Sequence, residues 1–336
     1  MSDGAGSLPT PCQIIAQYAD LAGCGHYRII EPASALNQAG LAQVATVAHW
    51  REAWVETEPA SSIVVQVATS PLQLAQLSVL QTLHGVKLVQ ELDDLTSALP
   101  VDKLAAFGLP ADISELTRRM TELADRVVVS TEVIADALHG KHRDIRVVPN
   151  RIDLGRWSGL TPMRVPGSKP RVGWAGGRTH HDDLLMLQAV VEALADEIDW
   201  VFFGSCPDSM LPWVQEFHHA VSFIEYPAKL ARLGLDLAIA PLESTAFNEA
   251  KSNLKLLEYG ILGYPVLCSD LLPYQCKLPV TRVANRPDAW VRTLRALLAD
   301  RDALRRQGAM LRDAVVKDWA LAPHVGDWLS AWVVAA

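Results

Sequence analysis

The sequence predicts an α/β fold in which two doubly wound parallel-sheet domains face a cleft. Short apolar, β-branched segments alternate with amphipathic segments along nearly the whole chain, which is typical of strands that alternate with helices. The apolar segments show little polar alternation, as expected for parallel strands that are buried on both faces. Residues 160–170 interrupt this pattern with three prolines, a glycine and no periodicity, and so indicate a linker.

The alternation gives an order of elements in each half of the chain. In the first half we expect strands at residues 12–18, 44–48, 63–68, 87–92, 126–130 and 145–148, and helices at 27–38, 72–83, 113–124 and 132–138. In the second half we expect strands at 171–175, 200–203, 221–224, 237–240, 265–269 and 281–284, and helices at 184–194, 254–261, 287–316 and 325–334. The predicted domains are therefore residues 1–157 and 158–318, followed by a final segment at 319–336.

Composition narrows the class of protein. Of the 336 residues, 50% are hydrophobic and 20% charged, which is enough for two cores and excludes wholesale disorder. The 30 Lys and Arg against 38 Asp and Glu give a net charge of −8. This balance argues against a nucleic-acid binder and against tight docking on an anionic membrane; at most a weak peripheral membrane contact is expected.

Targeting and redox signals point to a cytoplasmic protein. No apolar run reaches the ~18 residues that a membrane-spanning helix requires, and residues 2–7 form a polar tail without the pattern of a signal peptide. The odd set of cysteines has no C-x-x-C spacing, which argues against a disulfide framework or a zinc site and favours a reducing compartment. These cysteines are Cys12, Cys24, Cys206, Cys268 and Cys276.

Unusual residues follow several of the predicted strands, and ligands of open α/β sheets bind beyond the carboxyl ends of strands. Gly23 and Gly25 follow the first strand and precede a helix, so that backbone N–H groups there could approach an anion. Arg28 occupies the third glycine position of a G-x-G-x-x-G pattern, which disfavours a nicotinamide site. A tight turn between strand and helix is the alternative interpretation.

Carboxylates gather at the end of the strand at 87–92. Glu91, Asp93 and Asp94 lie within four positions, and such a cluster repels itself unless it has a partner. These groups could bind sugar hydroxyls, hold a divalent cation, or accept a proton from an acceptor hydroxyl. A solvated loop that caps the next helix is equally compatible with the pattern.

A glycine-rich loop follows the first strand of the second domain. Gly176 and Gly177 permit a close backbone approach, and Arg178 is of the type that binds phosphate in a bidentate manner. The adjacent His180 and His181 suggest a metal, but neighbouring histidines point in different directions and no third ligand is apparent. We therefore favour a pyrophosphate or hydroxyl contact and predict no metal site.

The segment from 240 to 270 carries the strongest signal. A strand ends, a polar loop follows, and a helix begins near Lys251, Ser252 and Asn253. Lys251 and Glu258 are seven residues apart, which places them on one helix face about 10 Å apart. A cation and free N–H groups suit a diphosphate, and a carboxylate two turns along suits the diol of a ribose. An ordinary amphipathic helix with a solvated Lys–Glu face is the alternative.

Together these segments resemble the family-4 glycosyltransferases of the GT-B fold. The run from 240 to 270 resembles their nucleotide-sugar segment, and residues 174–184 resemble their glycine-rich loop. Residues 148–153 are similar to their V-x-P-N-G-x-D motif, with Arg151 at the usual glycine. The resemblance implies two Rossmann-like domains, of which the first binds the acceptor and the second the donor, and a last helix that packs back on the first.

The resemblance also implies roles for individual residues. Arg178 and Lys251 would neutralise the diphosphate, with Asp93 and Asp94 as further catalytic candidates. Donor contacts would come from a set of glycines, polar residues and one carboxylate, namely Gly23, Gly25, Asn150, Gly176, Gly177, His180, Ser252, Asn253 and Glu258. His26 and Arg28 would contact the acceptor.

Three positions depart from the family pattern. Asp93 stands where many members have a histidine, and Ala250 stands eight positions before Glu258, where a glutamate is usual. The lysine that follows the glycine loop in the family is missing, with His180 and His181 nearby.

The predicted activity is transfer of a sugar from a nucleoside-diphosphate sugar to a glycan, protein or small-molecule hydroxyl, with retention and without a metal or other cofactor. Cations and a helix N-terminus would stabilise the departing diphosphate. Three alternatives stay open: a non-hydrolysing sugar-nucleotide epimerase, an inactive binding subunit, and an NAD-dependent oxidoreductase.

Overall fold

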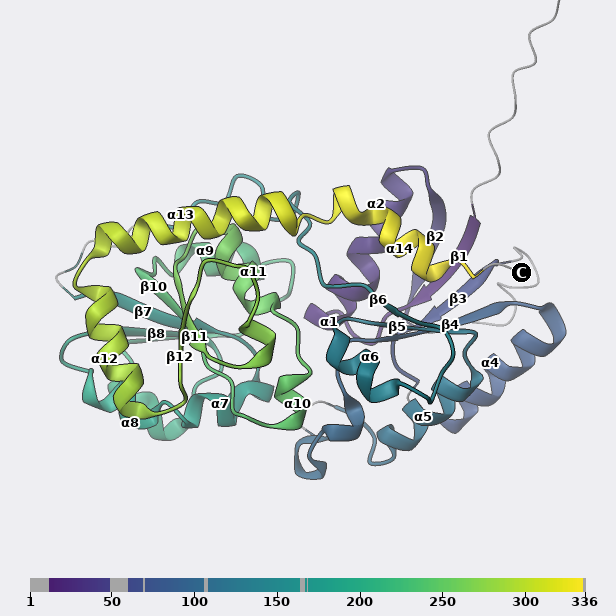
Figure 1. The fold of residues 1–336 in the computed structure, drawn as a ribbon, viewed down its shortest axis with the longest axis horizontal. Coiled ribbons are helices and arrows are strands. Elements are labelled where there is room, and N and C mark those ends of the chain that lie inside the picture. The colour runs from purple at the N-terminus through teal and green to yellow at the C-terminus, as the bar shows by residue number, and fades with distance from the viewer. Residues whose placement is uncertain are drawn as a thin grey trace, which may run out of the picture.

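The computed structural model describes residues 12–48, 60–68, 70–105, 108–163, 167 and 169–334. The predicted polar tail at 2–7 and residues 164–166 and 168 of the predicted linker lie outside these ranges. Two α/β domains lie side by side, each built on a six-stranded sheet (Figure 1). All strand pairs of both sheets are parallel, so the predicted fold class is confirmed.

The N-terminal sheet has the order β2-β1-β3-β4-β5-β6. Its strands are β1 (Cys12–Gln17), β2 (Ala42–Val47), β3 (Ser62–Val65), β4 (Lys87–Leu92), β5 (Arg126–Val129) and β6 (Ile145–Val147). Its helices are α1 (Gly23–Gly25), a π-helical turn (His26–Ile30), α2 (Glu31–Gln38), α4 (Pro71–His84), α5 (Ile113–Leu123) and α6 (Glu132–Leu138). The strand order reverses between β1 and β3, which is where open sheets of this kind bind ligands.

The C-terminal sheet has the order β12-β11-β10-β7-β8-β9, with its reversal between β7 and β10. Its strands are β7 (Arg171–Ala175), β8 (Asp199–Gly204), β9 (Glu216–His219), β10 (Leu237–Ala240), β11 (Val266–Ser269) and β12 (Thr281–Val283). Its helices are α7 (His181–Leu185), α8 (Gln188–Ala193), α9 (Tyr226–Arg232), α10 (Ala246–Glu249), α11 (Leu254–Ile261), α12 (Pro287–Leu298) and α13 (Arg301–Asp318).

Three predicted elements differ from the structure, one of which is the helix expected at 287–316: it is divided into α12 and α13. The strand expected at 221–224 is wrong, because the chain turns there before α9, and the edge strand is Glu216–His219 instead. That strand is only partly buried and carries Glu216, His218 and His219, so it lacks an apolar signature. The helix expected at 184–194 is divided into α7 and α8.

The last part of the chain connects the two domains. Helix α13 runs along the C-terminal domain, and α14 (Val325–Trp332) then lies beside α2 of the N-terminal domain (Figure 1). Trp328 and Trp332 are fully buried in one apolar cluster with Ile14 and Leu36. At roughly 25 cal/mol per Å² of buried apolar surface, these two indoles anchor the segment firmly.

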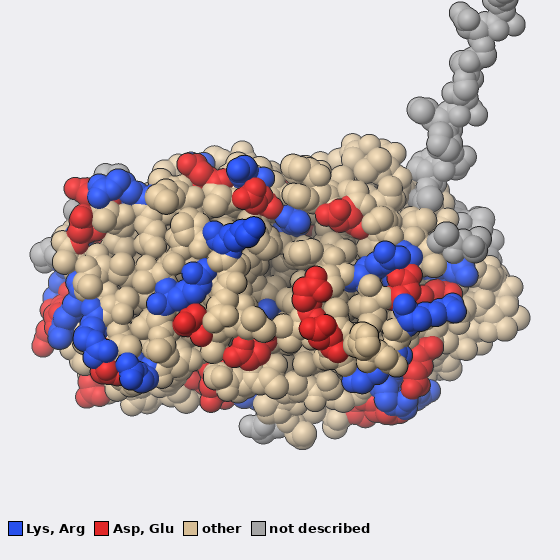
Figure 2. All heavy atoms as spheres, viewed as in Figure 1, with Lys and Arg blue, Asp and Glu red and all other residues tan. Residues whose placement is uncertain are grey.

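The described surface has a mixed charge pattern. Figure 2 shows Lys and Arg interspersed with Asp and Glu on the visible face, without a broad area of one sign. None of the helices in the described part of the chain is long and apolar enough to cross a membrane.

Candidate functional site

A cavity of about 490 Å³ lies between the two domains, at the carboxyl ends of the central strands. The loop after β1, the end of β4 and Asn150 supply its N-terminal wall. The loop after β7, Tyr274 and the start of α11 supply its C-terminal wall. Its lining includes Asp20, Ala22, Gly23, Cys24, Tyr27, Arg28, Asp93, Asp94, Asn150, Gly177, Thr179, His180, Lys251, Ser252, Leu254, Lys255, Glu258 and Tyr274.

Two lysines and one carboxylate line this cavity: Lys251 just before α11, and Lys255 and Glu258 on the helix itself. Lys251 Nζ lies 3.4 Å from Asp94 Oδ1, across the cleft, and 4.4 Å from the centre of the Phe247 ring. Lys255 Nζ donates to the Ala175 carbonyl at 2.7 Å and lies 3.4 Å from Glu258 Oε2. The spacing of three residues places Lys255 and Glu258 on one face of α11. The helix begins at Leu254 and not near Lys251 as expected, so Lys251 reaches the cavity from the segment before it.

Sequence reasoning missed Lys255. The available signal was its position, one turn after Lys251 and three residues before Glu258, on the same face that those two residues had identified. The opposite face of α11 carries Leu256, Leu257 and Ile261, which are buried against the sheet and α13. This amphipathic pattern fixes which side chains point into the cleft.

Arg178, which the sequence paired with Lys251, lies elsewhere. Its exposed side chain lines a separate hollow with His181, Cys206 and Asp208. The cations that the C-terminal domain brings to the cavity are thus Lys251 and Lys255. The loop that carries Arg178 turns outward because residues 178–180 form a single 3-10 turn that leads into α7.

Glu258 is 6% exposed and connects both domains. Its Oε1 accepts from the Tyr27 hydroxyl at 3.1 Å, and its Oε2 accepts from the Tyr226 hydroxyl at 2.9 Å. Burial and the nearby Glu258 carboxylate raise the pKa of both tyrosines well above their ordinary value, so they stay protonated donors. A diol at this place would find a carboxylate already arranged to accept two hydroxyl hydrogen bonds.

The carboxylates of Asp20, Asp93 and Asp94 form the opposite side of the cavity. The Cys24 sulfur and carboxylate oxygens of Asp93 and Asp94 all lie within 4.8 Å of one another, so these three residues could hold a metal ion. Burial and the neighbouring Asp94 raise the pKa of Asp93 to about 6. The Asp20 carboxylate sits at the start of α1, where it accepts from the backbone N–H groups of Ala22 at 2.8 Å and Gly25 at 3.0 Å.

Arg28, which the sequence assigned to the acceptor, lines the cavity with a side chain that is already bound to other groups of the protein. Its side chain is fully buried, and it pairs with Glu91 and donates to the Val148 carbonyl and to Asn150 Oδ1. Burial raises the pKa of Glu91 to about 7, while Arg28 acts in the opposite direction. Asn150 Nδ2 in turn donates to Ser252 Oγ at 2.9 Å, which links the two domains next to Lys251.

The glycine loops approach the cavity to different degrees. Gly23 and Gly177 line it, and Gly176 lines an adjoining hollow of about 430 Å³ with Phe203, Phe223 and Tyr226. Gly25 instead packs against the backbone of Asp20, where a Cβ on residue 25 would lie 1.9 Å from the Asp20 carbonyl oxygen. Gly204, with a φ of +93°, lets the end of β8 approach Gly176 closely. A Cβ on residue 204 would lie 2.2 Å from the Gly176 carbonyl oxygen.

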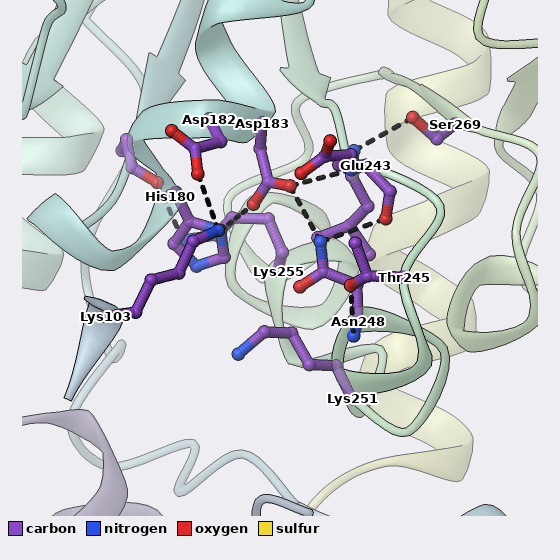
Figure 3. Close-up of polar contacts among 12 residues, drawn as sticks. Lys103, His180, Asp182, Asp183, Glu243, Thr245, Asn248, Lys251, Lys255 and Ser269 are labelled. Atoms are coloured by element: carbon purple, nitrogen blue, oxygen red, sulfur yellow. Dashed lines mark hydrogen bonds and ion pairs between the residues drawn. The ribbon is translucent and has the colours of Figure 1, made fainter. Parts of the chain in front are cut away.

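His180 lines the cavity with a fixed ring. Its Nδ1 lies 2.7 Å from Asp183 Oδ2, and burial lowers the pKa of the imidazole. Figure 3 shows the Asp183 carboxylate between His180 and the loop before α10, where it accepts from Glu243 N and Asn248 Nδ2. Asp183 therefore positions the histidine and the loop that leads to Lys251.

Two further predicted residues lie outside the cavity. His26 stacks on Phe223 at 4.4 Å and contacts Arg156, so it fills the boundary between the domains. Asn253 is 7% exposed and occupies the cap position before α11, with its Nδ2 directed to Cys276 Sγ.

Comparisons with known proteins identify the fold. No protein-family model and no curated protein sequence matches the chain. A sucrose-phosphate synthase structure from Thermosynechococcus elongatus is similar, with 15% identity, a TM-score of 0.70 and 96% of this chain and 98% of that chain covered. HepE from Anabaena, in complex with UDP and glucose, has 11% identity, a TM-score of 0.62 and coverage of 95% and 100%.

An enzyme of another class shares the architecture. A Listeria monocytogenes structure described as a UDP-N-acetylglucosamine 2-epimerase has 10% identity, a TM-score of 0.56 and 96% coverage of both chains. Identities this low carry information about the fold alone. The chain has the two-domain GT-B fold, in which two parallel-sheet domains enclose an interdomain cleft.

Proposed function

We propose that the protein is a glycosyltransferase that moves a sugar from a nucleoside-diphosphate sugar to an acceptor hydroxyl. The observation that carries this proposal is a cluster at the start of α11: Lys251, just before the helix, and Lys255 and Glu258, on it, all line the interdomain cavity. Two ammonium groups match the two phosphates of the donor, and Glu258 matches the ribose diol. The similarity to HepE, which was solved with UDP and glucose, supports the same class of substrate.

In the proposed reaction, the bond between the anomeric carbon and the β-phosphate oxygen breaks. A bond from that carbon to the acceptor oxygen forms, and the acceptor proton passes to the departing phosphate. Lys251 and Lys255 stabilise the negative charge that grows on the phosphate, which is the kind of interaction that contributes most to such reactions. Asp93 and Asp94, opposite the lysines, stabilise the positive charge that develops on the sugar.

Two finer features belong to the proposal as well. Two fixed ammonium groups supply the charge that a divalent cation otherwise supplies, so turnover proceeds without a metal or other cofactor. The family resemblance implies transfer with retention at the anomeric carbon. A cytoplasmic location fits the described cysteines, since Cys24, Cys206, Cys268 and Cys276 are free thiols.

A panel of UDP-, GDP- and ADP-sugars tests the proposed function. One nucleotide should raise the melting temperature, and its sugar should be transferred in the presence of an acceptor, with release of the nucleoside diphosphate. The Glu258→Ala variant should lose most of the thermal shift. Binding without any release would identify an inactive binding subunit instead.

An epimerase is the second candidate, because the Listeria structure and the carboxylates opposite the lysines are both compatible with it. A donor sugar that changes configuration in the absence of any acceptor would establish this alternative. NMR of the incubated donor distinguishes the two reactions.

A further inference from the structure

The two walls of the cavity carry opposite charges, and this asymmetry bears on the acceptor. The C-terminal wall presents Lys251, Lys255 and the Glu258 carboxylate, all of which the proposed function assigns to the donor. The N-terminal wall presents Asp20, Asp93 and Asp94, which we call the acidic wall. With the diphosphate on the lysine side, as the proposed function has it, the acidic wall is the side that remains for an acceptor.

Cations on the N-terminal side are already committed to other groups. Arg28 is the one cation that this domain contributes to the cavity among the described lining residues, and it is fully buried on Glu91. Lys103 reaches the cleft nearby but pairs with Asp182 of the other domain at 2.6 Å. An anionic acceptor group would therefore meet carboxylates and no available cation.

The acidic wall already holds one ammonium group. Lys251 Nζ lies 3.4 Å from Asp94 Oδ1, and a bound diphosphate would compete for that ammonium. Binding of the donor thus leaves the wall with more uncompensated negative charge than before. Asp20 adds to the negative charge of the acidic wall, since its carboxylate contributes to the raised pKa of both Cys24 and Asp93.

We propose that the acceptor carries an ammonium group, as an amino sugar or aminocyclitol does, and that Asp20 and its acidic neighbours select it. This inference rests on the proposed function and specifies the acceptor half of the same site. A phosphorylated acceptor is rejected, because its charge would lie within a few ångströms of like charges in a partly enclosed cavity. A neutral sugar is accepted less well, since it gains no charge pairing.

Asp20 offers a clean test because it lies outside the groups assigned to the chemistry. In the Asp20→Asn variant the amide oxygen can still accept from Ala22 N and Gly25 N, so the start of α1 is preserved while the charge is removed. Asp112→Asn removes an exposed carboxylate of the same domain outside the cavity and serves as the matched control.

The probes are glucosamine, glucose and a glucose phosphate, titrated calorimetrically at neutral pH and low salt into protein saturated with its nucleoside diphosphate. We expect glucosamine to bind at least about fivefold more tightly than glucose, and the phosphate weakest of all. Asp20→Asn should abolish the preference for glucosamine, and Asp112→Asn should keep it.

The inference would be overturned if the three probes bound equally, if the phosphate bound most tightly, or if glucosamine did not bind. It would also be overturned if Asp20→Asn kept the preference for glucosamine. A Mg²⁺ or Mn²⁺ ion bound by Cys24 and Asp93 with the donor would also overturn it, since that ion would neutralise the wall. Failure of every nucleoside diphosphate to bind would instead overturn the proposed function, and the inference would fall with it.

Discussion

At the scale of single residues, the pair of cations at the diphosphate site is the feature on which the proposed chemistry depends. Lys255 is held by the Ala175 carbonyl and by Glu258, so its ammonium is already oriented before a ligand arrives. Lys251 is placed by the chain just before α11 and by the Phe247 ring. Preorganised charge of this kind is effective because little reorganisation accompanies the reaction.

The Lys255→Met variant should bind the nucleoside diphosphate about 10- to 100-fold more weakly, because a charge-assisted hydrogen bond contributes ~1.5–3 kcal/mol. Isothermal titration calorimetry measures this loss. Arg178→Met is the matched control, since Arg178 lies outside the cavity, and it should bind like the wild type. Weaker binding by Arg178→Met together with unchanged binding by Lys255→Met would indicate that the diphosphate binds at the glycine-rich loop instead.

The rate should depend on pH through Asp93. Burial and Asp94 raise its pKa to about 6, so activity that needs the ionised carboxylate is lost as the pH falls through about 6 and is full above it. Asp94→Asn removes the neighbouring negative charge and should move this acid limb to lower pH. The profile of kcat/KM against pH measures the shift, and an unmoved limb would assign it to another group.

Many of the residues that line the cavity can be predicted from the sequence, and those that lie elsewhere were placed from weaker signals. Sequence spacing pointed to Lys251 and Glu258, which both line the cavity although α11 begins only at Leu254. Arg178 and Gly25 were assigned from loop composition, and a loop does not determine the direction of its side chains. Arg28 was assigned to the acceptor from the family resemblance, and its buried ion pair with Glu91, 63 residues away, leaves no signal in the local sequence.

At the scale of elements, close packing between α13 and α11 decides the orientation of the helix that carries the site. Gly308 of α13 contacts the end of α11, where a Cβ would lie 2.0 Å from the Gly263 carbonyl oxygen. This approach allows Leu311 and Val315 to bury against α11.

The Gly308→Ala variant should be destabilised although alanine is the better helix former. Its propensity gain of ~1 kcal/mol is outweighed by a forced shift of the helices that costs ~1–3 kcal/mol. The Cβ that Gly326→Ala adds in α14 has no atom within 4 Å. This variant should instead be more stable than the wild type by ~0.5–1 kcal/mol. Differential scanning calorimetry of both variants shows whether each substitution lowers or raises the stability of the protein. A Gly308→Ala protein as stable as the wild type would refute the close contact.

Elements buried on both faces were predicted well, because a continuous apolar run is a strong signal. Strands β4, β7 and β10 have the expected bounds. The edge strand β9 was missed since one side of it is solvated, and 221–224 was chosen because it is more apolar.

At the scale of the whole molecule, the segment from β10 to α11 joins the domains. Phe247 of α10 is buried among Leu99, Leu104 and Ile113 of the N-terminal domain. Other contacts across the cleft are Tyr27–Glu258, Asp94–Lys251, Thr131–Ala250, Asn150–Ser252 and Lys103–Asp182. Several of these contacts involve the residues proposed to bind the donor, so we expect donor binding to affect how the two domains close.

The Phe247→Ala variant should weaken this closure. Loss of a buried aromatic ring at the interface, worth ~1–2 kcal/mol in the closed state, should lower kcat/KM about 5- to 30-fold. Small-angle scattering should show a larger radius of gyration without nucleotide. Leu211→Ala, which trims a 40% exposed side chain of the C-terminal domain, should change neither quantity. An unchanged radius and rate for Phe247→Ala would show that the ring does not hold the domains together.

The central claim is that a diphosphate binds between Lys251 and Lys255, with its ribose on Glu258. A crystal structure of the complex with the nucleoside diphosphate that gives the largest thermal shift tests this most directly. We predict phosphate oxygens within hydrogen-bond distance of both ammonium groups, and ribose hydroxyls on the Glu258 carboxylate. A nucleotide bound in the hollow beside Arg178, or a cavity that stays empty at saturating nucleotide, would contradict the assignment.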